Sequence, residues 1–501
     1  MKRSKLHIKI LAAALLLGAA ALTACSSGQS RVNGKELQAT LPLEDCQIAS
    51  PGSSESTDAR CGRLSVFEDP LAGKGKQIEL FVAVVPAVSR TPEGDPLFLL
   101  AGGPGEAATE AFPQFSSIFV SIHQKRDIVL VDQRGTGKSN SLKCPSTAET
   151  IEPTSDDFDV VKVRKELETC LATFDADPRL YTTSQAVHDL DQVRQALGYE
   201  KVNLMGVSYG SRMAMAYLRQ YPQQVKTIIL DGVNPIDWEL GPYNPANAQR
   251  AMDLILDRCE KNEACSQTFP NIKKKFADMM MNLEKQPVEV NLPHPITGEP
   301  ETLTLTRQKA ATTLMLISYS PESTALLPLM IHNAASNHDY SILAAQYLSS
   351  MDGLEKAISD GMYLSVLCSE DVPFYPVSNP QTDSYLPVRL EFLKKECELW
   401  PHTAVSKELK KPVSSDVPVL LLSGEADPVT PPANGEQVAE DLKNSLHLVV
   451  PGMGHGQFYR GCMPRVITNF IQSGTLENLD TTCVEKVKAA PFFLNFAGPK
   501  P

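Results

Sequence analysis

Short runs of consecutive apolar residues recur along the first half of the chain, and each ends at a glycine or a turn. They lie at 96–100, 127–131, 201–205 and 227–232, after a longer, partly alternating run at 77–85. Such runs are typical of strands buried on both faces, as in a parallel sheet covered by helices. Residues 184–197 repeat apolar side chains at helical spacing between two of the runs. The alternation predicts an α/β fold.

The pattern becomes mainly helical from about residue 234 to 411. Helical spacing of apolar residues predicts five helices there, at 248–262, 270–283, 307–318, 328–335 and 340–349. A polar, proline-bearing stretch at 287–305 is interpreted as a hairpin or a loop. The earlier rhythm then resumes with a strand at 418–422, a helix at 435–444, a strand at 445–450 and a helix at 464–472. A mainly helical segment that interrupts a sheet predicts an inserted cap domain.

The N-terminus has the features of an export signal. A basic stretch at 1–5 precedes a run of mostly alanine and leucine at 8–22, which is too short for a confident membrane span. The run ends in Leu-Thr-Ala-Cys, which resembles a bacterial lipobox with lipid on Cys25. We therefore expect an exported protein, lipid-anchored to a membrane of a bacterial cell envelope. The predicted divisions are a signal peptide at 1–25, a flexible tether at 26–45, a first core part at 46–233, the cap at 234–411 and a second core part at 412–501.

Cysteine usage agrees with export. Setting Cys25 aside leaves ten of the 11 cysteines, and they fall as near neighbours in the sequence. This spacing favours five local disulfides formed in an oxidising compartment, although some of the cysteines could be buried free thiols. The pairs are Cys46 with Cys61, Cys144 with Cys170, Cys259 with Cys265, Cys368 with Cys397, and Cys462 with Cys483.

Charge and motif spacing exclude several classes of ligand. The formal net charge of −12 argues against a nucleic-acid partner, which needs a basic face. Residues 135–139 (GTGKS) look like the end of a nucleotide-binding loop, but Asp132 stands where its first glycine is required. No cysteine or histidine cluster has zinc-ligand spacing. We expect no nucleotide, no metal and no cofactor.

Ser208 is the predicted catalytic nucleophile. It lies in the run GVSYG at 206–210, between a predicted strand and a predicted helix at 209–220. In a G-x-S-x-G turn, small flanking residues permit a tight elbow that holds the serine hydroxyl out of the sheet. The following helix points its N–H groups at developing negative charge. The alternative is a turn serine that only caps the helix.

Asp427 and His455 are the predicted partners of Ser208. Asp427 lies in the turn after the strand at 418–422, and His455 lies in a glycine-rich loop after the strand at 445–450. The acid holds the imidazole in the correct tautomer, and the histidine moves the proton. Glu425 and Asp231 are weaker candidates for the acid, and His447 falls inside a predicted strand.

Two backbone N–H groups are needed to stabilise the oxyanion of the tetrahedral intermediate. The N–H of Tyr209, directly after the nucleophile, is the first candidate. The second should come from Gly102 or Gly103, because the following Pro104 has no N–H. The alternative for this Gly-Gly-Pro-Gly run is an ordinary loop.

Several motifs together resemble the proline iminopeptidase and tripeptidyl aminopeptidase branch of the α/β-hydrolases (peptidase family S33). They are GGPG at 102–105, DQRGTG at 132–137, GVSYG at 206–210, GEADPVTP at 424–431 and GH at 454–455. The resemblance spans roughly 60–490 and implies an α/β-hydrolase fold with an inserted, mainly helical cap. The tripeptidyl subgroup is also similar in the run CSED at 368–371. Ala101 replaces the histidine of many proline iminopeptidases, which disfavours strict removal of proline.

The resemblance implies cleavage of short peptides from a free N-terminus. An exopeptidase must neutralise the substrate ammonium at a fixed distance from the nucleophile. Glu370, Asp371 and Glu106 are candidates for this role; each could instead be a solvated carboxylate. The expected function is a serine aminopeptidase that acts through an acyl-enzyme. The alternatives are a carboxylesterase or lipase with the same triad, and a non-catalytic envelope lipoprotein that binds peptides.

Overall fold

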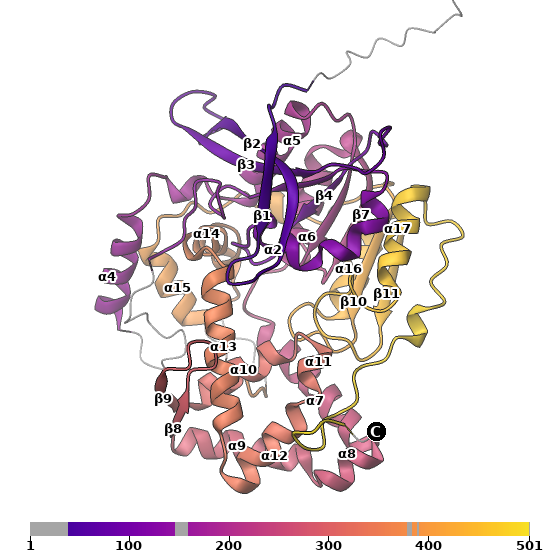
Figure 1. Ribbon diagram of the computed structural model, residues 1–501. Helices are drawn as coiled ribbons and strands as arrows, with labels where there is room; N and C mark the ends of the chain where they lie inside the picture. Colours follow the sequence, from indigo (N-terminus) through magenta and orange to yellow (C-terminus); the bar gives the residue numbers. More distant parts are fainter. Residues whose placement is uncertain (1–38, 146–158, 378–382, 388–389, 500–501) are drawn as a thin grey trace, which may run out of the picture. The chain divides into compact units, whose positions relative to one another are not determined.

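A nine-stranded sheet forms the centre of the molecule. The computed structural model describes residues 39–145, 159–377, 383–387 and 390–499 (Figure 1). The strands follow the order β1-β2-β3-β5-β4-β6-β7-β10-β11; the pairs from β1 to β5 are antiparallel and the others parallel. Their bounds are β1 Glu44–Ala49, β2 Ser56–Phe67, β3 Gln77–Val85, β4 Leu97–Leu100, β5 Ile128–Val131, β6 Val202–Val207, β7 Val225–Asp231, β10 Val419–Gly424 and β11 Ser445–Val450. The prediction of an α/β fold with a mostly parallel sheet is confirmed.

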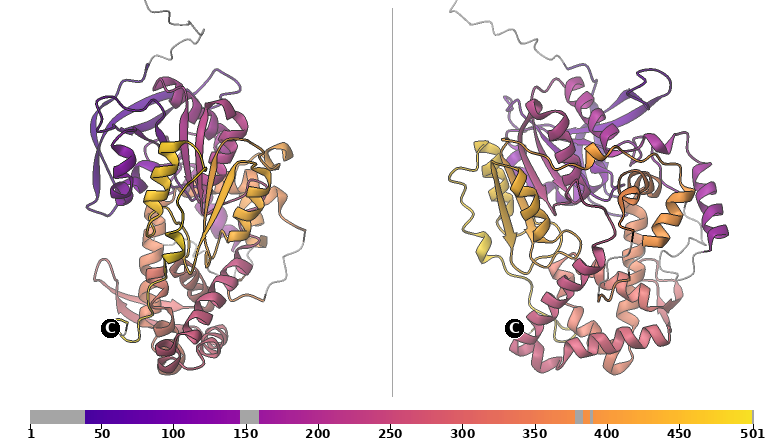
Figure 2. Two further views of the ribbon diagram at one scale, coloured as in Figure 1. Left: turned by 90° about the vertical axis from the view of Figure 1, so that its right-hand side faces the viewer. Right: turned by 180° about the vertical axis from the view of Figure 1, so that it is seen from behind.

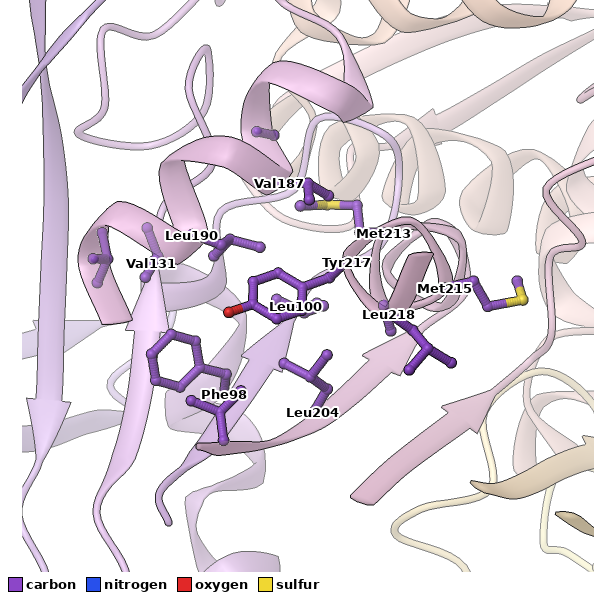
Figure 3. Close-up of a cluster of buried hydrophobic side chains, with 14 of the residues drawn as sticks. Phe98, Leu100, Val131, Val187, Leu190, Leu204, Met213, Met215, Tyr217 and Leu218 are labelled. Atoms are coloured by element: carbon purple, nitrogen blue, oxygen red, sulfur yellow. The ribbon is translucent and has the colours of Figure 1, made fainter. Parts of the chain in front are cut away.

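Alternation along the strands divides the buried side chains between two hydrophobic clusters, one on each face of the sheet. Phe98, Leu100 and Leu204 pack on the face covered by α5 (Thr183–Ala196) and α6 (Tyr209–Gln220) (Figure 3). Leu97 and Met205, their neighbours in the chain, pack on the opposite face. The elements that cover this second face are η1 (Phe112–Phe119) and α17 (Met463–Ser473). The consecutive apolar residues therefore reflect burial on both faces.

The chain between β7 and β10 is mainly helical and gathers around a hydrophobic cluster of its own. Figures 1 and 2 show α7 to α13 grouped at one end of the sheet. The stretch at 287–305, whose sequence is compatible with a hairpin or a loop, is a hairpin in which β8 pairs with β9. The elements are α7 Asn244–Lys261, α8 Glu263–Thr268, α9 Ile272–Lys285, β8 Val288–Pro293, β9 Pro300–Leu305, α10 Arg307–Ile317, α11 Pro321–Thr324, α12 Leu327–Asn337, α13 Ser341–Ala357, α14 Asp360–Val366 and α15 Leu390–Leu399. The predicted limits at 234 and 411 stay predictions.

The structure differs from the sequence prediction near the N-terminus. Strands β1 and β2 were not predicted, because most of their side chains are polar or exposed. The N–H groups of Thr40 and Leu41 both donate to the carbonyl of Ala196 at the end of α5. The last residues of the predicted tether are therefore attached to the core. The predicted signal peptide, Cys25 and the rest of the tether lie outside the described residues.

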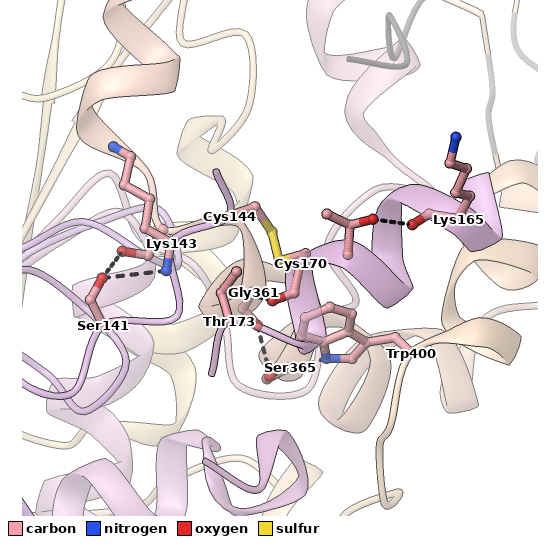
Figure 4. Close-up of a disulfide and its surroundings, with 11 residues drawn as sticks. Ser141, Lys143, Cys144, Lys165, Cys170, Thr173, Gly361, Ser365 and Trp400 are labelled. Carbon is pink, nitrogen blue, oxygen red and sulfur yellow. Dashed lines mark hydrogen bonds between the residues drawn. A yellow bond between two sulfur atoms is a disulfide. The ribbon is translucent and has the colours of Figure 1, made fainter. Parts of the chain in front are cut away.

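Among the described residues there are five disulfides, with the pairing that the near-neighbour spacing favours. The Cys144–Cys170 bond joins the loop before α4 (Val160–Leu171) to the last turn of that helix (Figure 4). It lies close to Trp400, whose indole N–H donates to Ser365 Oγ at 3.1 Å. Within the described part of the chain, no helix is long and apolar enough to cross a bilayer.

The DQRGTG run at 132–137 folds onto the core. Arg134 is fully buried and donates from Nε and Nη2 to both oxygens of Asp189 on α5, at 2.7 and 2.8 Å. The Asp132 carboxylate accepts the backbone N–H groups of Thr109 and Lys138, each at 3.0 Å. Two buried charges need such partners. The loop thus ties β5 to the start of α2 (Ala108–Ala111) and to α5.

Candidate active site

Ser208 occupies a sharp turn between β6 and α6, with φ +56° and ψ −122°. Gly206 and Gly210, on either side of the turn, have no room for a side chain. A Cβ on Gly206 would lie 2.1 Å from the carbonyl oxygen of Gly210, and a Cβ on Gly210 would lie 2.2 Å from that of Leu100. The turn is therefore the strained elbow that exposes a nucleophilic hydroxyl at the end of a strand.

Asp427 and His455 lie at the carboxyl ends of neighbouring parallel strands, β10 and β11. Nδ1 of His455 is 2.8 Å from Oδ2 of Asp427. The other oxygen of Asp427 accepts the backbone N–H groups of Val429 and Thr430 at 2.9 and 2.8 Å. These bonds fix the direction of the carboxylate. With Nδ1 held by the acid, Nε2 is the ring nitrogen left to exchange a proton with Ser208.

The two partners shift each other's pKa in opposite directions. Burial raises the pKa of Asp427, but the charge of His455 and its hydrogen bond outweigh this, so the pKa lies below its ordinary value. Burial lowers the pKa of His455, but the charge of Asp427 and its hydrogen bond outweigh this too, so the pKa lies above 6.5. The site favours the aspartate–imidazolium form that a proton-abstracting histidine must reach.

The alternative acids have other partners. Glu425 is exposed and accepts the backbone N–H of Gly452 at 2.7 Å. Asp231 is buried, and its carboxylate accepts the backbone N–H groups of Gln457 and Phe458 in the histidine loop. His447 shares a 2.9 Å hydrogen bond with Ser423. Asp427 is therefore the carboxylate that holds the imidazole.

The oxyanion loop departs in one respect from the prediction. The N–H of Gly102 donates to Oε2 of Glu106 at 2.8 Å, so it is engaged by that carboxylate. Gly103, with φ +100°, remains the predicted donor in this loop. Tyr209 is the first residue of α6, and the N–H groups of a first helical turn have no partner within the helix. The prediction for Tyr209 thus has a structural basis.

Glu106 lies beside the nucleophile. A Cβ on Gly102 would be 3.1 Å from Oε2 of Glu106 and 3.3 Å from Cβ of Ser208, so the two side chains flank the same glycine. Burial raises the pKa of Glu106, and neither the Gly102 N–H nor the charge of His455 reverses that rise. The insertion touches this loop, because the N–H of Ser359 donates to the carbonyl of Gly105 at 2.9 Å.

A cavity of about 930 Å³ opens onto Ser208, His455 and Glu106. One part of its wall is aromatic and comprises Phe112, Phe115, Phe119, Phe458 and Tyr459. Another part carries four carboxylates from α4, α13, α14 and α15, which are Glu166, Glu355, Asp360 and Glu396. Within the part of the chain that the structure describes, no lysine or arginine lines this cavity. The cavity is large enough for a short chain, and among its described lining residues the acidic side chains outnumber the basic ones.

The two other residues predicted to bind the substrate amine do not line the cavity. Glu370 is buried, and its carboxylate accepts the N–H and the hydroxyl of Thr183 at 2.6 and 2.7 Å. Asp371 is fully buried and ion-paired with Arg212 at 2.9 Å. Because neither carboxylate lines the cavity beside Ser208, the structure does not support the predicted role of Glu370 and Asp371 as amine partners. Of the three candidates, Glu106 alone faces the nucleophile.

Two residues near the triad were not found from the sequence. Thr430 donates its hydroxyl to Oδ2 of Asp427 at 2.8 Å and lies 3.0 Å from Nδ1 of His455. Its position in the same turn, three residues after Asp427, could have indicated this role. Tyr319, two residues after the end of α10, accepts the N–H of His455 on its carbonyl and packs its ring against the imidazole. Nothing local in the sequence marks Tyr319. No group of described residues could hold a metal ion.

Comparison with known proteins agrees with this geometry. Residues 95–268 match the family model described as "alpha/beta hydrolase fold", and residues 387–483 match the model described as "TAP-like protein". The chain has the α/β-hydrolase fold. It is 25% identical to serine protease Hip1 of Mycobacterium tuberculosis over 96% of this chain and 99% of that one. It is also 30% identical to the tripeptidyl aminopeptidase of Streptomyces lividans over 35% of this chain and 36% of that one. The proline iminopeptidase of Neisseria gonorrhoeae is 29% identical over 29% of this chain and 34% of that one.

These relatives confirm the resemblance stated from the motifs. The prediction of an enzyme of the serine hydrolase class is also confirmed.

Replacing Asp427 by Asn tests the acid of this α/β-hydrolase. We expect kcat to fall about 10,000-fold, because the imidazole loses the partner that holds its tautomer. His455 accepts a proton only when neutral, so the activity of the parent rises with pH through a pKa above 6.5. Loss of the Asp427 charge lowers that pKa, and the acidic limb of the residual kcat/KM profile should move to lower pH. The measurement is hydrolysis of p-nitrophenyl acetate from pH 4 to pH 9.

Glu425→Gln is the matched control for this change. Its carboxylate lies on the surface of the same turn, and we expect kcat to stay within about twofold of the parent value. An equal loss in both variants would contradict the assignment of Asp427.

Proposed function

We propose that this α/β-hydrolase is an exported, lipid-anchored aminopeptidase that releases short N-terminal fragments from peptides through an acyl-enzyme. The observation that carries the proposal is the charge of the cavity that opens onto Ser208. Its wall bears carboxylates and, among the described lining residues, neither lysine nor arginine. Acidic lining residues, of which Glu106 lies beside Ser208, favour a ligand of the opposite sign, such as the ammonium group of a free peptide N-terminus.

Each group of the site has a defined role in the proposed reaction. Ser208 Oγ attacks the scissile carbonyl carbon while His455 Nε2 takes the hydroxyl proton. The oxyanion accepts hydrogen bonds from Tyr209 and Gly103. His455 then gives its proton to the leaving amine as the C–N bond breaks, which leaves the N-terminal fragment as an ester on Ser208. Water, deprotonated by His455, hydrolyses that ester and frees the serine.

Glu106 is the proposed partner of the substrate ammonium. Its carboxylate and the Ser208 side chain lie on either side of Gly102. A short peptide fragment could therefore place its ammonium group at Glu106 and its scissile carbonyl at Ser208. A cationic ligand lowers the pKa that burial has raised, because it favours the charged carboxylate. The three relatives, by name a serine protease and two exopeptidases, support peptide substrates. The aromatic part of the wall, which includes Phe115 and Phe458, also suits an acyl chain, as a carboxylesterase would need.

A panel of substrates separates these functions. The purified chain is assayed with peptidyl fluorophores of one to four residues, each with a free or an acetylated N-terminus, and with short acyl esters. We expect hydrolysis of the free peptides, and at least about 100-fold lower kcat/KM for their acetylated forms, because acetylation removes the ammonium charge. Ser208→Ala should abolish turnover of every substrate. Ester turnover without peptide turnover would favour the carboxylesterase instead, and no turnover at all would favour the non-catalytic lipoprotein.

Replacing Glu106 by Gln tests the amine site. Gln still accepts the N–H of Gly102 but carries no charge, so KM for free peptides should rise roughly tenfold or more. KM for p-nitrophenyl acetate should not change. Glu110→Gln is the control, since Glu110 lies on the neighbouring helix α2 and does not line the cavity. Equal effects on free and acetylated peptides would count against Glu106 as the amine partner.

The proposed anchor has a separate test. In a bacterial host, the chain should fractionate with membranes and carry lipid on Cys25 by mass spectrometry. Cys25→Ala should release it from the membrane fraction, because acyl chains supply the affinity for the bilayer. Ser26→Ala should remain bound. A membrane-bound Cys25→Ala variant would refute the lipid anchor.

A further inference from the structure

The sequence suggested that the acidic residues of the run at 368–371 bind the substrate amine, but in the structure this run is buried away from the cavity. It follows α14, where the chain returns from the inserted helices, and it packs behind the nucleophile helix α6. Its two acidic residues contact the core at two points. Asp371 binds Arg212 of α6, and Glu370 binds Thr183, the first residue of α5. Neither contact belongs to the catalytic triad, and neither faces the cavity.

Thr183 connects Glu370 to Tyr209. The Thr183 hydroxyl donates to Oε2 of Glu370 at 2.7 Å and lies 2.7 Å from the phenol oxygen of Tyr209. A hydroxyl has one proton, and that of Thr183 points to the carboxylate oxygen of Glu370. Because the Thr183 proton is used on Glu370, the bond between the two hydroxyls is donated by Tyr209. The side-chain amide of Gln133 in turn donates to Tyr209 at 3.2 Å.

The result is a chain of hydrogen bonds that runs in one direction, from Gln133 through Tyr209 and Thr183 to Glu370. Its members come from four separate segments: the loop after β5, the start of α6, the start of α5, and the segment that returns from the insertion. The ring of Tyr209 is fully buried, so solvent cannot replace a missing partner. Tyr209 is the residue directly after Ser208, and its backbone N–H is the proposed oxyanion donor.

We propose that Glu370, Thr183 and Gln133 are positioning residues that hold the ring of Tyr209 and, through it, the N–H that stabilises the oxyanion. This rests on the proposed acyl-transfer function. An N–H donor is effective when it points to the place where the negative charge develops. A buried phenol anchored at its far end limits rotation of the first residue of α6. The oxyanion hole is therefore complete when the segment at 367–371 is docked on the core.

Tyr209→Phe tests the chain while the ring stays in place. We expect kcat to fall about tenfold or more with KM unchanged, because a misdirected donor weakens the transition state but not substrate binding. Thr183→Val should lower kcat similarly. The double variant should be no worse than either single one, since both break the same chain. Thr183→Ser keeps the hydroxyl and should retain the parent kcat.

Tyr217→Phe is the matched control. Tyr217 lies on the same helix, is also fully buried, and bonds Asp191 through its hydroxyl at 2.9 Å. It should lose thermal stability to a similar extent as Tyr209→Phe and keep the parent kcat. A merely structural role for Tyr209 would make the two variants alike in kcat. That result, or an unchanged kcat in Tyr209→Phe, would overturn the proposal.

Two further measurements separate this proposal from the proposed peptidase function. A peptidyl trifluoromethyl ketone forms an oxyanion on the serine, and its inhibition constant should rise in Tyr209→Phe by the same factor as kcat/KM falls. A fluorophosphonate phosphonylates Ser208: the serine oxygen forms a bond to phosphorus and fluoride leaves, a step that uses the oxyanion donors but needs no peptide specificity. If the parent chain cleaves no peptide, a slower fluorophosphonate reaction in Tyr209→Phe still supports the positioning role. An unchanged fluorophosphonate rate overturns it.

Discussion

Arg212 and Asp371 form an ion pair that is almost completely closed to solvent, with 1% and 0% of the side chains exposed. The guanidinium also donates to the carbonyl of Trp238 at 2.7 Å, on the chain that leaves the sheet for the insertion. Two segments of the chain between β7 and β10, at Trp238 and at Asp371, therefore meet on one side chain of α6. Burying a pair of charges adds little to net stability, but leaving one of them unpaired costs about 3–5 kcal/mol. The pair thus fixes where the insertion joins the nucleophile helix.

The position of that helix depends in turn on a backbone constraint in the sheet. The carbonyl of Leu100, at the end of β4, leaves no room for a side chain on Gly210. Strand β4 lies beside β6, so the same close approach places the oxyanion loop next to Ser208. Strands β6, β7, β10 and β11 are parallel neighbours, and their carboxyl ends share one edge. The triad assembles there although its members are far apart in the sequence.

What the sequence could predict follows from the range of the interactions involved. The strands and the Asp427 turn are marked by local patterns, namely buried runs followed by glycine or an Asp-Pro turn, and these predictions agree with the structure. Strands β1 and β2 have mostly exposed side chains and no such pattern. Glu370 and Asp371 have partners 187 and 159 residues away, Thr183 and Arg212, so local sequence showed their charge but not their burial. A free carboxylate and a paired one look the same in a sequence.

Two buried aspartates near His455 show how one loop separates structural from catalytic charge. Burial raises the pKa of Asp231 to about 6, even though backbone N–H groups of Gln457 and Phe458 oppose the rise. Asp427 has a lowered pKa, because it faces the imidazole directly. One carboxylate therefore holds the backbone of the histidine loop, and the other carries the charge that the imidazolium needs. Asp427 sets the orientation of the His455 ring, and Asp231 sets the shape of its loop. Because His455 interacts with both, a change at either aspartate reaches the nucleophile through this histidine.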